Sequence, residues 1–225
     1  MATETETRAL IDRLAAAPEP VRPIAPPMHR AALWLALSLP ITGALVLAMT
    51  PRADLALKLA ESRFVLEQAG ALVTAIAAAA AAFAMVVPGL SRRWAAFGLA
   101  PAAAWVLTLG AGCVSDLARS GREGLALGAD AMCLPYIAMI GMAPAALLVA
   151  MLRRGAPTAP RGALFLAMLA AAAMGNFGLR FFHEQDAGLM VLVWQFGSVL
   201  LLASLGGLCG PHVLCWRHRS ARGDR

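Results

Sequence analysis

ALVTAIAAAAAAFAMVVPGL, the stretch from Ala71 to Leu90, runs for twenty residues without a single charged side chain. At a helical rise of about 1.5 Å per residue, a stretch of this length crosses the roughly 30 Å hydrocarbon core of a bilayer. Its alanine run from Ala77 to Ala82 would let neighbouring helices approach closely, as small residues do in membrane bundles. The stretch therefore predicts a membrane-crossing helix that packs inside a bundle.

Five further apolar stretches of similar length accompany the first. Apolar residues make up 60% of the chain, charged residues 14%, and the mean hydropathy is +0.70. A soluble chain is nearer 45–50% apolar and about 25% charged. We therefore predict an all-α integral membrane protein, a six-helix bundle over residues 31–214, and exclude a soluble, disordered or disulfide-stapled chain. The expected spans are residues 31–50, 71–90, 94–114, 131–152, 162–182 and 187–210.

The charged residues divide unevenly between the two sides of the predicted bundle. Thirteen of the 19 Lys and Arg residues fall on the side that holds both termini, whereas eight of the 13 acidic residues fall on the other. Because cytoplasmic loops carry the excess of Lys and Arg, we expect both termini in the cytoplasm. The net charge of +6 is then explained by topology and by contact with anionic lipid, and not by direct nucleic-acid binding.

The cytoplasmic tail, residues 1–30, is expected to begin with a short amphipathic helix over residues 3–17. Thr3 and Glu6 fit a capping box at its start. A helix this short is marginal alone in water, so its apolar stripe needs a partner. The stripe consists of Leu10, Ile11, Leu14 and Ala17.

Residues 18–27 contain five prolines and predict an extended tether between that helix and the membrane. We interpret the tethered helix as a binding segment for a cytosolic protein. The alternatives are a disordered tail and a helix that folds back onto the bundle. Residues 215–225 form a second, basic cytoplasmic tail.

Sulfur, imidazole and carboxylate groups gather at the predicted outer face. Cys113 ends the third span, Cys133 opens the fourth, and His183 and Glu184 follow the fifth. We expect them in one outer shell with three further carboxylates, those of Asp116, Asp130 and Asp186. Such a set can bind a soft or borderline divalent metal ion, and two outer thiols can also form a redox-active disulfide. Neither spacing is a recognised metal motif, however, and a cysteine in a bundle is often a packing residue. Arg180 and Glu184, four residues apart, can also simply pair with each other.

The polar residues within and beside the spans are also compatible with a second class of function. Asn176 and Gln195 can hydrogen-bond between helices or line a transport path, and His29 with His212 is a conceivable haem pair. This reading describes a small transporter or a haem-binding electron-carrier subunit. No phosphate loop, nucleophile elbow or zinc-protease motif is present, so we do not expect an enzyme.

Several short motifs follow one another along the chain: Leu10–Ile11–Asp12 with Leu14, Pro20–Val21–Arg22–Pro23, Pro26–Pro27, Arg30, Arg63–Phe64, Val87–Pro88–Gly89, Cys133, Phe182–His183, Trp194, Gly206–Gly207, Gly210 and Trp216–Arg217. In their order and spacing they resemble the NrsF family, whose members are six-span inner-membrane anti-sigma factors for extracytoplasmic-function sigma factors. The resemblance implies that this chain holds a sigma factor at the bacterial inner membrane until metal or oxidative stress releases it. It also implies that the sigma factor contacts Leu10, Ile11, Leu14 and Arg22.

The resemblance places stress sensing at Cys133, His183, Glu184 and Cys113. The family is associated with two outer-face cysteines, the second directly after a histidine, whereas here His183 is followed by Glu184. A disulfide from Cys133 to that position is therefore impossible in this chain. Either Cys113 takes the partner's role, or Cys133, His183 and Glu184 bind a metal ion.

Overall fold

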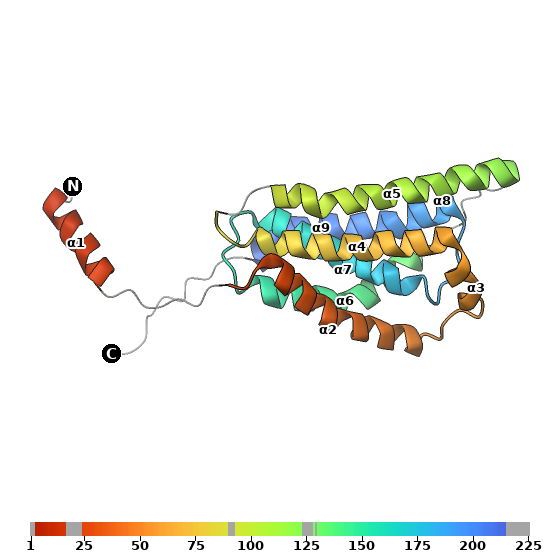
Figure 1. Cartoon of the computed structure of the whole chain (residues 1–225), viewed down its shortest axis with the longest axis horizontal. Coiled ribbons are helices and arrows are strands. Elements are labelled where there is room, and N and C mark those ends of the chain that lie inside the picture. Colours follow the sequence, from red (N-terminus) through yellow and green to blue (C-terminus); the bar gives the residue numbers. More distant parts are fainter. Residues whose placement is uncertain (1–2, 17–23, 90–92, 123–127, 129, 215–225) are drawn as a thin grey trace.

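The computed structural model describes residues 3–16, 24–89, 93–122, 128 and 130–214. Within these ranges the regular structure is entirely helical, and six long helices lie side by side as one bundle (Figure 1). Each of the six is long and apolar enough to cross a membrane, which confirms the predicted all-α, six-helix fold. They are α2 (Pro27–Ala48), α4 (Ser62–Ala84), α5 (Arg93–Ser120), α6 (Cys133–Leu152), α7 (Pro160–Leu179) and a composite sixth helix over Gly188–Val213.

The sixth helix contains a π-helical segment. It consists of α8 (Gly188–Met190), η2 (Val191–Phe196) and α9 (Gly197–Val213), which follow one another without a break. π-helical turns inside α-helices are rare and occur often at functional sites.

The second membrane-length helix begins earlier than the hydropathy pattern predicts. The expected span begins at residue 71, but α4 already begins at Ser62, directly after the short helix α3 (Leu55–Ala60). The charges of Arg63 and Glu67 do not end the apolar helix because the two side chains pair with each other at 3.0 Å.

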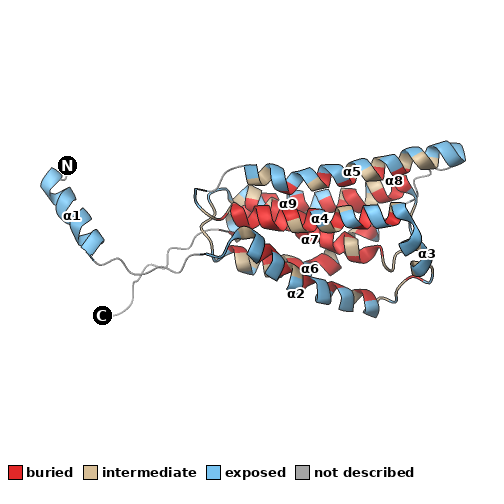
Figure 2. Cartoon of the chain, in the orientation of Figure 1, coloured by how far each residue is buried: buried red, intermediate tan, exposed pale blue. Residues whose placement is uncertain are grey.

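The centre of the bundle is built from α7 and the alanine-rich half of α4 (Figure 2). Two glycines let the backbones of α6 and α7 approach each other closely. A Cβ atom at Gly141 would lie 2.8 Å from the carbonyl oxygen of Ala171, and one at Gly175 would collide with that of Ile137. This close crossing holds the first turn of α6 and the last turn of α7 at the same end of the bundle.

The two ends of the bundle differ in charge. All the described acidic residues of the bundle lie at one end, where α4 and α6 begin and α7 ends. We call it the carboxylate end, and its acidic residues are Asp54, Glu61, Glu67, Asp116, Asp130, Glu184 and Asp186. The opposite end, where α2 and α7 begin and α6 and α9 finish, is the arginine end: Arg30, Arg93, Arg153, Arg154 and Arg161. That the arginine end faces the cytoplasm stays a prediction.

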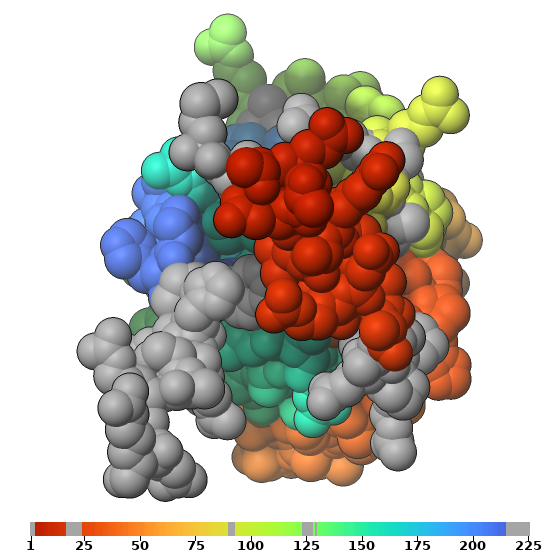
Figure 3. Space-filling model, turned by 90° about the vertical axis from the view of Figure 1, so that its left-hand side faces the viewer, coloured from red at the N-terminus to blue at the C-terminus, as the bar shows by residue number. Residues whose placement is uncertain are grey.

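The tail helix α1 (Glu4–Ala16) lies apart from the bundle, beyond its arginine end (Figure 1, Figure 3). The predicted capping box is confirmed: Thr3 N donates to Glu6 Oε2 at 2.8 Å, and Glu6 N donates to Thr3 Oγ1 at 3.4 Å. No residue of α1 is buried, so its apolar stripe has no partner within the described residues. Most of the predicted tether, including Arg22, and the basic tail 215–225 lie outside those residues.

Candidate functional site

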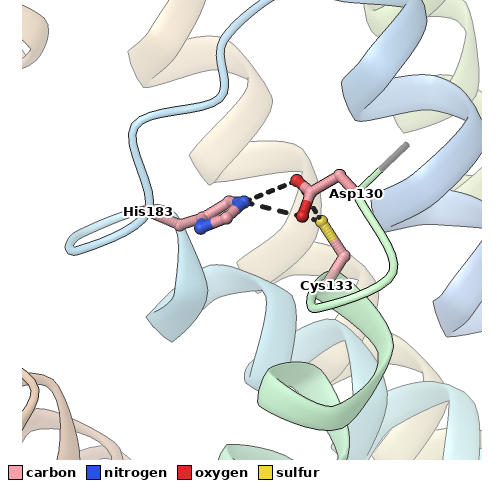
Figure 4. Close-up of side chains that lie close together, drawn as sticks. All are labelled: Asp130, Cys133 and His183. Atoms are coloured by element: carbon pink, nitrogen blue, oxygen red, sulfur yellow. Dashed lines mark hydrogen bonds and ion pairs between the residues drawn. The ribbon is translucent and has the colours of Figure 1, made fainter. Parts of the chain in front are cut away.

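Three side chains with metal-ligating atoms meet at the carboxylate end (Figure 4). Asp130 lies just before α6, Cys133 is the first residue of α6, and His183 lies in the loop after α7. Asp130 Oδ2 lies 2.6 Å from His183 Nε2 and 3.0 Å from Cys133 Sγ, and Sγ lies 3.7 Å from Nε2. We call these residues the Asp–Cys–His cluster.

Local structure at the start of α6 brings Asp130 and Cys133 together. The backbone N–H of Cys133 donates to the carbonyl oxygen of Asp130 at 3.2 Å, which forms a turn and sets the two side chains three residues apart on one side. One turn further on, the ring of Tyr136 contacts Phe182 edge to face, at 5.5 Å between centroids, and lies 6.3 Å from His183. The first turn of α6 thus supports the loop that carries the histidine.

The sixth helix anchors the segment before Asp130. Trp194, inside the π-helical turn η2, donates from Nε1 to the carbonyl oxygen of Gly128 at 2.9 Å. Gln195, the next residue, is buried and donates to the carbonyl oxygen of Gln185 at 3.4 Å. The turn η2 therefore contacts both segments that supply the cluster, the one before α6 and the one after α7.

Hydrogen bonding keeps Asp130 ionised in spite of its burial. Burial alone would raise its pKa, but the hydrogen bonds from the Cys133 thiol and from His183 lower it below the usual range. Cys133 is only 1% exposed, and its thiol donates to this carboxylate. The cluster thus offers a carboxylate oxygen, an imidazole nitrogen and a sulfur to one point.

Arg52, in the segment between α2 and α3, holds the His183 loop in place. Its backbone N–H donates to the carbonyl oxygen of Phe181 at 3.0 Å, and its Nη1 donates to that of His183 at 3.2 Å. The same guanidinium forms bidentate pairs with Asp54 and Asp186. In the sequence Arg52 counts only as one outer charge, because nothing local indicates that it reaches a loop 130 residues away.

Further ion pairs tie the same loop to α4. Arg180, at the end of α7, pairs with Glu67 at 2.9 Å and with Asp186 at 3.5 Å. The alternative in which Arg180 pairs with Glu184 is not what the structure shows: the guanidinium turns into the bundle, towards buried Glu67, while Glu184 is exposed. The loop is fixed on both sides of His183 by arginine side chains.

The structure brings together two of the four predicted sensing residues, Cys133 and His183. The carboxylate beside them belongs to Asp130 and not to the exposed Glu184. Cys113 lies on α5. Its thiol and that of Cys133 are both free, so no disulfide joins them. The spacing of Asp130, three residues before Cys133 at the start of a helix, is the signal that could have identified it as the third member.

The cluster fits a borderline divalent cation such as Zn²⁺. Such ions accept sulfur, nitrogen and oxygen ligands, and the three candidate atoms lie within 4.8 Å of one another. A tetrahedral ion would need one further ligand, which water or a neighbouring carboxylate can supply. The same thiol is also the group that an oxidant would attack.

Six membrane-length helices and one cluster of ligating side chains define a small multi-pass helical membrane protein, with no separate folded domain among the described residues. The family model of NrsF, described as negative regulator of sigma F, matches residues 14–216. The chain belongs to this family, and the resemblance noted in its sequence is confirmed. Comparisons with curated proteins and with solved structures gave no match. Family membership identifies the chain as a negative regulator with a sigma factor as its partner.

Proposed function

We propose that this chain is a membrane-bound anti-sigma factor whose Asp–Cys–His cluster senses the inducing stress. In the resting state it sequesters an extracytoplasmic-function sigma factor at the bacterial inner membrane. It releases the sigma factor when the cluster binds a divalent metal ion or when its thiol is oxidised. The role is regulatory and not enzymatic, and the observation that carries the sensing step is the convergence of Asp130, Cys133 and His183.

Metal binding is the form of sensing that the geometry favours. The cluster joins the start of α6 to the loop after α7, so a ligand held by all three side chains changes how these elements sit against each other. Binding requires loss of the thiol proton and replaces the 2.6 Å contact between Asp130 and His183 with bonds to the ion. Glu184 is exposed and does not belong to the cluster, so a water molecule would supply the remaining ligand.

Thiol oxidation is the alternative signal at the same residues. Oxidation of Cys133 would break its 3.0 Å hydrogen bond to Asp130 and so disturb the same contacts. Two observations make it the less favoured route. Cys133 is almost completely buried, and Cys113 is not bonded to it.

The exposed stripe of α1 supports capture of the sigma factor by the tail. Leu10, Ile11 and Leu14 are all exposed large apolar side chains on one helix, and a helix of 13 residues is marginal in water without a partner. Insertion of such a face into a groove is a common mode of peptide recognition. Because sigma factors act in the cytosol, this proposal places α1 and the arginine end on the cytoplasmic side, in agreement with the excess of arginine there.

Metal titration of the purified full-length protein tests the sensing step. We expect isothermal calorimetry to show one Zn²⁺ site, and Cys133→Ser and Asp130→Asn each to weaken it at least tenfold. Cys209→Ser is the matched control, since this thiol is exposed and far from the cluster on α9. Equal affinity in all variants would remove the metal-sensing proposal; a Cys133→Ser variant that alters only peroxide induction would favour oxidation.

Co-purification tests the tail. We expect the sigma factor retained by the full-length protein to be lost when Leu10 and Leu14 are both replaced by serine. The control replaces Ala9 and Ala16, on the opposite face of α1, by serine. Retention by both variants would show that the sigma factor binds elsewhere.

A further inference from the structure

Arg30 is a buried cation at the arginine end that has no carboxylate partner among the described residues. It lies in the first turn of α2 and is 7% exposed. Its Nη2 donates to the carbonyl oxygen of Met151, near the end of α6, at 2.5 Å, and its guanidinium lies 4.3 Å from the ring centre of Phe83. Its Nη1 has no hydrogen-bond partner in the described part of the chain.

The buried arginine at the opposite end shows what is missing around Arg30. Arg180 is 3% exposed; its Nη1 also lacks a hydrogen-bond partner among the described residues, but its guanidinium pairs with Glu67 and Asp186. Within the described ranges, every acidic residue of the bundle lies at that carboxylate end. Near Arg30 lies another cation instead: the backbone N–H of Arg154 donates, at 3.4 Å, to the same Met151 carbonyl oxygen that accepts from Arg30.

A buried charge is costly unless an opposite charge accompanies it. Removing Arg30 from water and placing a second cation near it therefore requires a counter-ion. Since the described bundle supplies none at this end, we look for the counter-ion outside the protein.

Arg30 lies at one end of the membrane-length helices, the level at which lipid headgroups are expected to contact such a bundle. The residue stands in the first turn of a membrane-length helix, and Met151 lies near the last residue of another. Exposed Arg153, Arg154 and Arg161 extend the positive surface across the ends of α6 and α7. Basic sites between helices at this depth bind anionic headgroups, and the planar guanidinium matches the oxygens of a phosphate.

We propose that Arg30 and Arg154 form a binding site for the phosphate group of an anionic phospholipid. A phosphate oxygen accepts a hydrogen bond from Arg30 Nη1, and exposed Arg154 supplies the second positive charge. A lipid is favoured over an acidic protein segment because Arg30 lies in the first turn of a membrane-length helix, at the level expected for headgroups. The site links α2 to α6 through the contact of Arg30 with Met151. It does not depend on the proposed sensing step.

Lipid titration of the full-length protein in a neutral detergent tests this site. Phosphatidylglycerol is added, with phosphatidylcholine of the same acyl chains as the reference, and bound lipid is counted by native mass spectrometry. We expect phosphatidylglycerol to be retained and to raise the unfolding temperature, and phosphatidylcholine to do neither. Arg154→Gln should weaken the apparent affinity about fivefold, the equivalent of about 1 kcal/mol for one arginine near a charged headgroup. Arg30→Gln should remove the preference, whereas Arg30→Lys should keep part of it.

The control is Arg119→Gln, which removes an exposed arginine from the other end of the bundle, on the last turn of α5. This variant should bind phosphatidylglycerol as the wild type does. Arg154→Gln carries the test if Arg30→Gln does not fold, because Arg154 is exposed. Three results would overturn the proposal: no preference for phosphatidylglycerol, equal weakening by Arg119→Gln and Arg154→Gln, or full stabilisation by inorganic phosphate at matched ionic strength. Stabilisation by an aspartate-rich peptide without any lipid preference would replace the lipid by a protein partner.

Discussion

Replacing Arg52 by methionine should loosen the loop that carries His183. Methionine keeps much of the volume of the side chain but removes every hydrogen bond that the guanidinium donates. Arg52 is buried, with a side chain 2% exposed, and donates to Asp54, Asp186 and the His183 carbonyl. Deleting one member of a buried ion pair costs about 3–5 kcal/mol. Asp54 is 40% exposed, and Asp186 keeps its contacts with Lys58 and Arg180, so we expect a loss of about 3 kcal/mol.

Thermal unfolding in detergent measures this loss, which corresponds to a fall of about 6–12 °C for a chain of this length. The matched control is Lys58→Met. Lys58 also pairs with Asp186, at 3.2 Å, but its side chain is 19% exposed, so its removal should cost at most about 1 kcal/mol. Amide exchange across residues 181–187 should accelerate in Arg52→Met and stay unchanged in Lys58→Met. Equal stability of the two variants would refute the view that Arg52 fixes the loop.

Three further outcomes follow from contacts elsewhere in the bundle. In a chemical denaturation assay, Gly175→Ala should lower the unfolding free energy by about 1–3 kcal/mol, because the added Cβ would collide with the backbone of α6. Gly43→Ala is the control: a Cβ there has nothing within 4 Å, so this variant should be neutral or stabilising by up to about 1 kcal/mol. Trp34→Phe should cost about 1 kcal/mol in that assay, since it removes the buried 3.0 Å hydrogen bond from the indole to a carbonyl oxygen of α6. Burial raises the pKa of Asp186, but the hydrogen bonds from Arg52 and the neighbouring cations lower it below its usual value. Its contribution to stability is therefore complete above about pH 4 and is lost as the pH falls through the lowered pKa, so acid titration of unfolding should show a weaker pH dependence in Asp186→Asn than in the wild type.

The sequence was sufficient for the six-helix fold because the signal there is local. An uncharged run of about 20 residues has few alternatives to a membrane-length helix. The start of α4 was missed because its first turns carry Arg63 and Glu67, and hydropathy treats charges as the end of a span. A hydropathy profile contains no information on pairing, whereas these two side chains neutralise each other and form ion pairs with neighbouring elements.

The candidate site was only partly predictable because its members come from distant segments. Chain order suggested Glu184 as the carboxylate, since it adjoins His183. In the folded chain the carboxylate is that of Asp130, because the turn before α6 directs this side chain towards Cys133, whereas Glu184 is exposed to solvent. The role of Arg52 could not be predicted at all: its contact with His183 joins residues 131 positions apart, and no pattern in a single sequence encodes it.

The tail helix α1 buries no residue against the six-helix bundle. Substitutions on its surface therefore leave the packing around α4 and α7 untouched, and changes in that core leave the face of α1 as it is. If α1 captures the sigma factor as proposed, recognition of the partner and stability of the membrane bundle depend on separate residues. Partner affinity can thus change during evolution without a loss of bundle stability. A different segment grafted in place of α1 could direct the same bundle to a different protein.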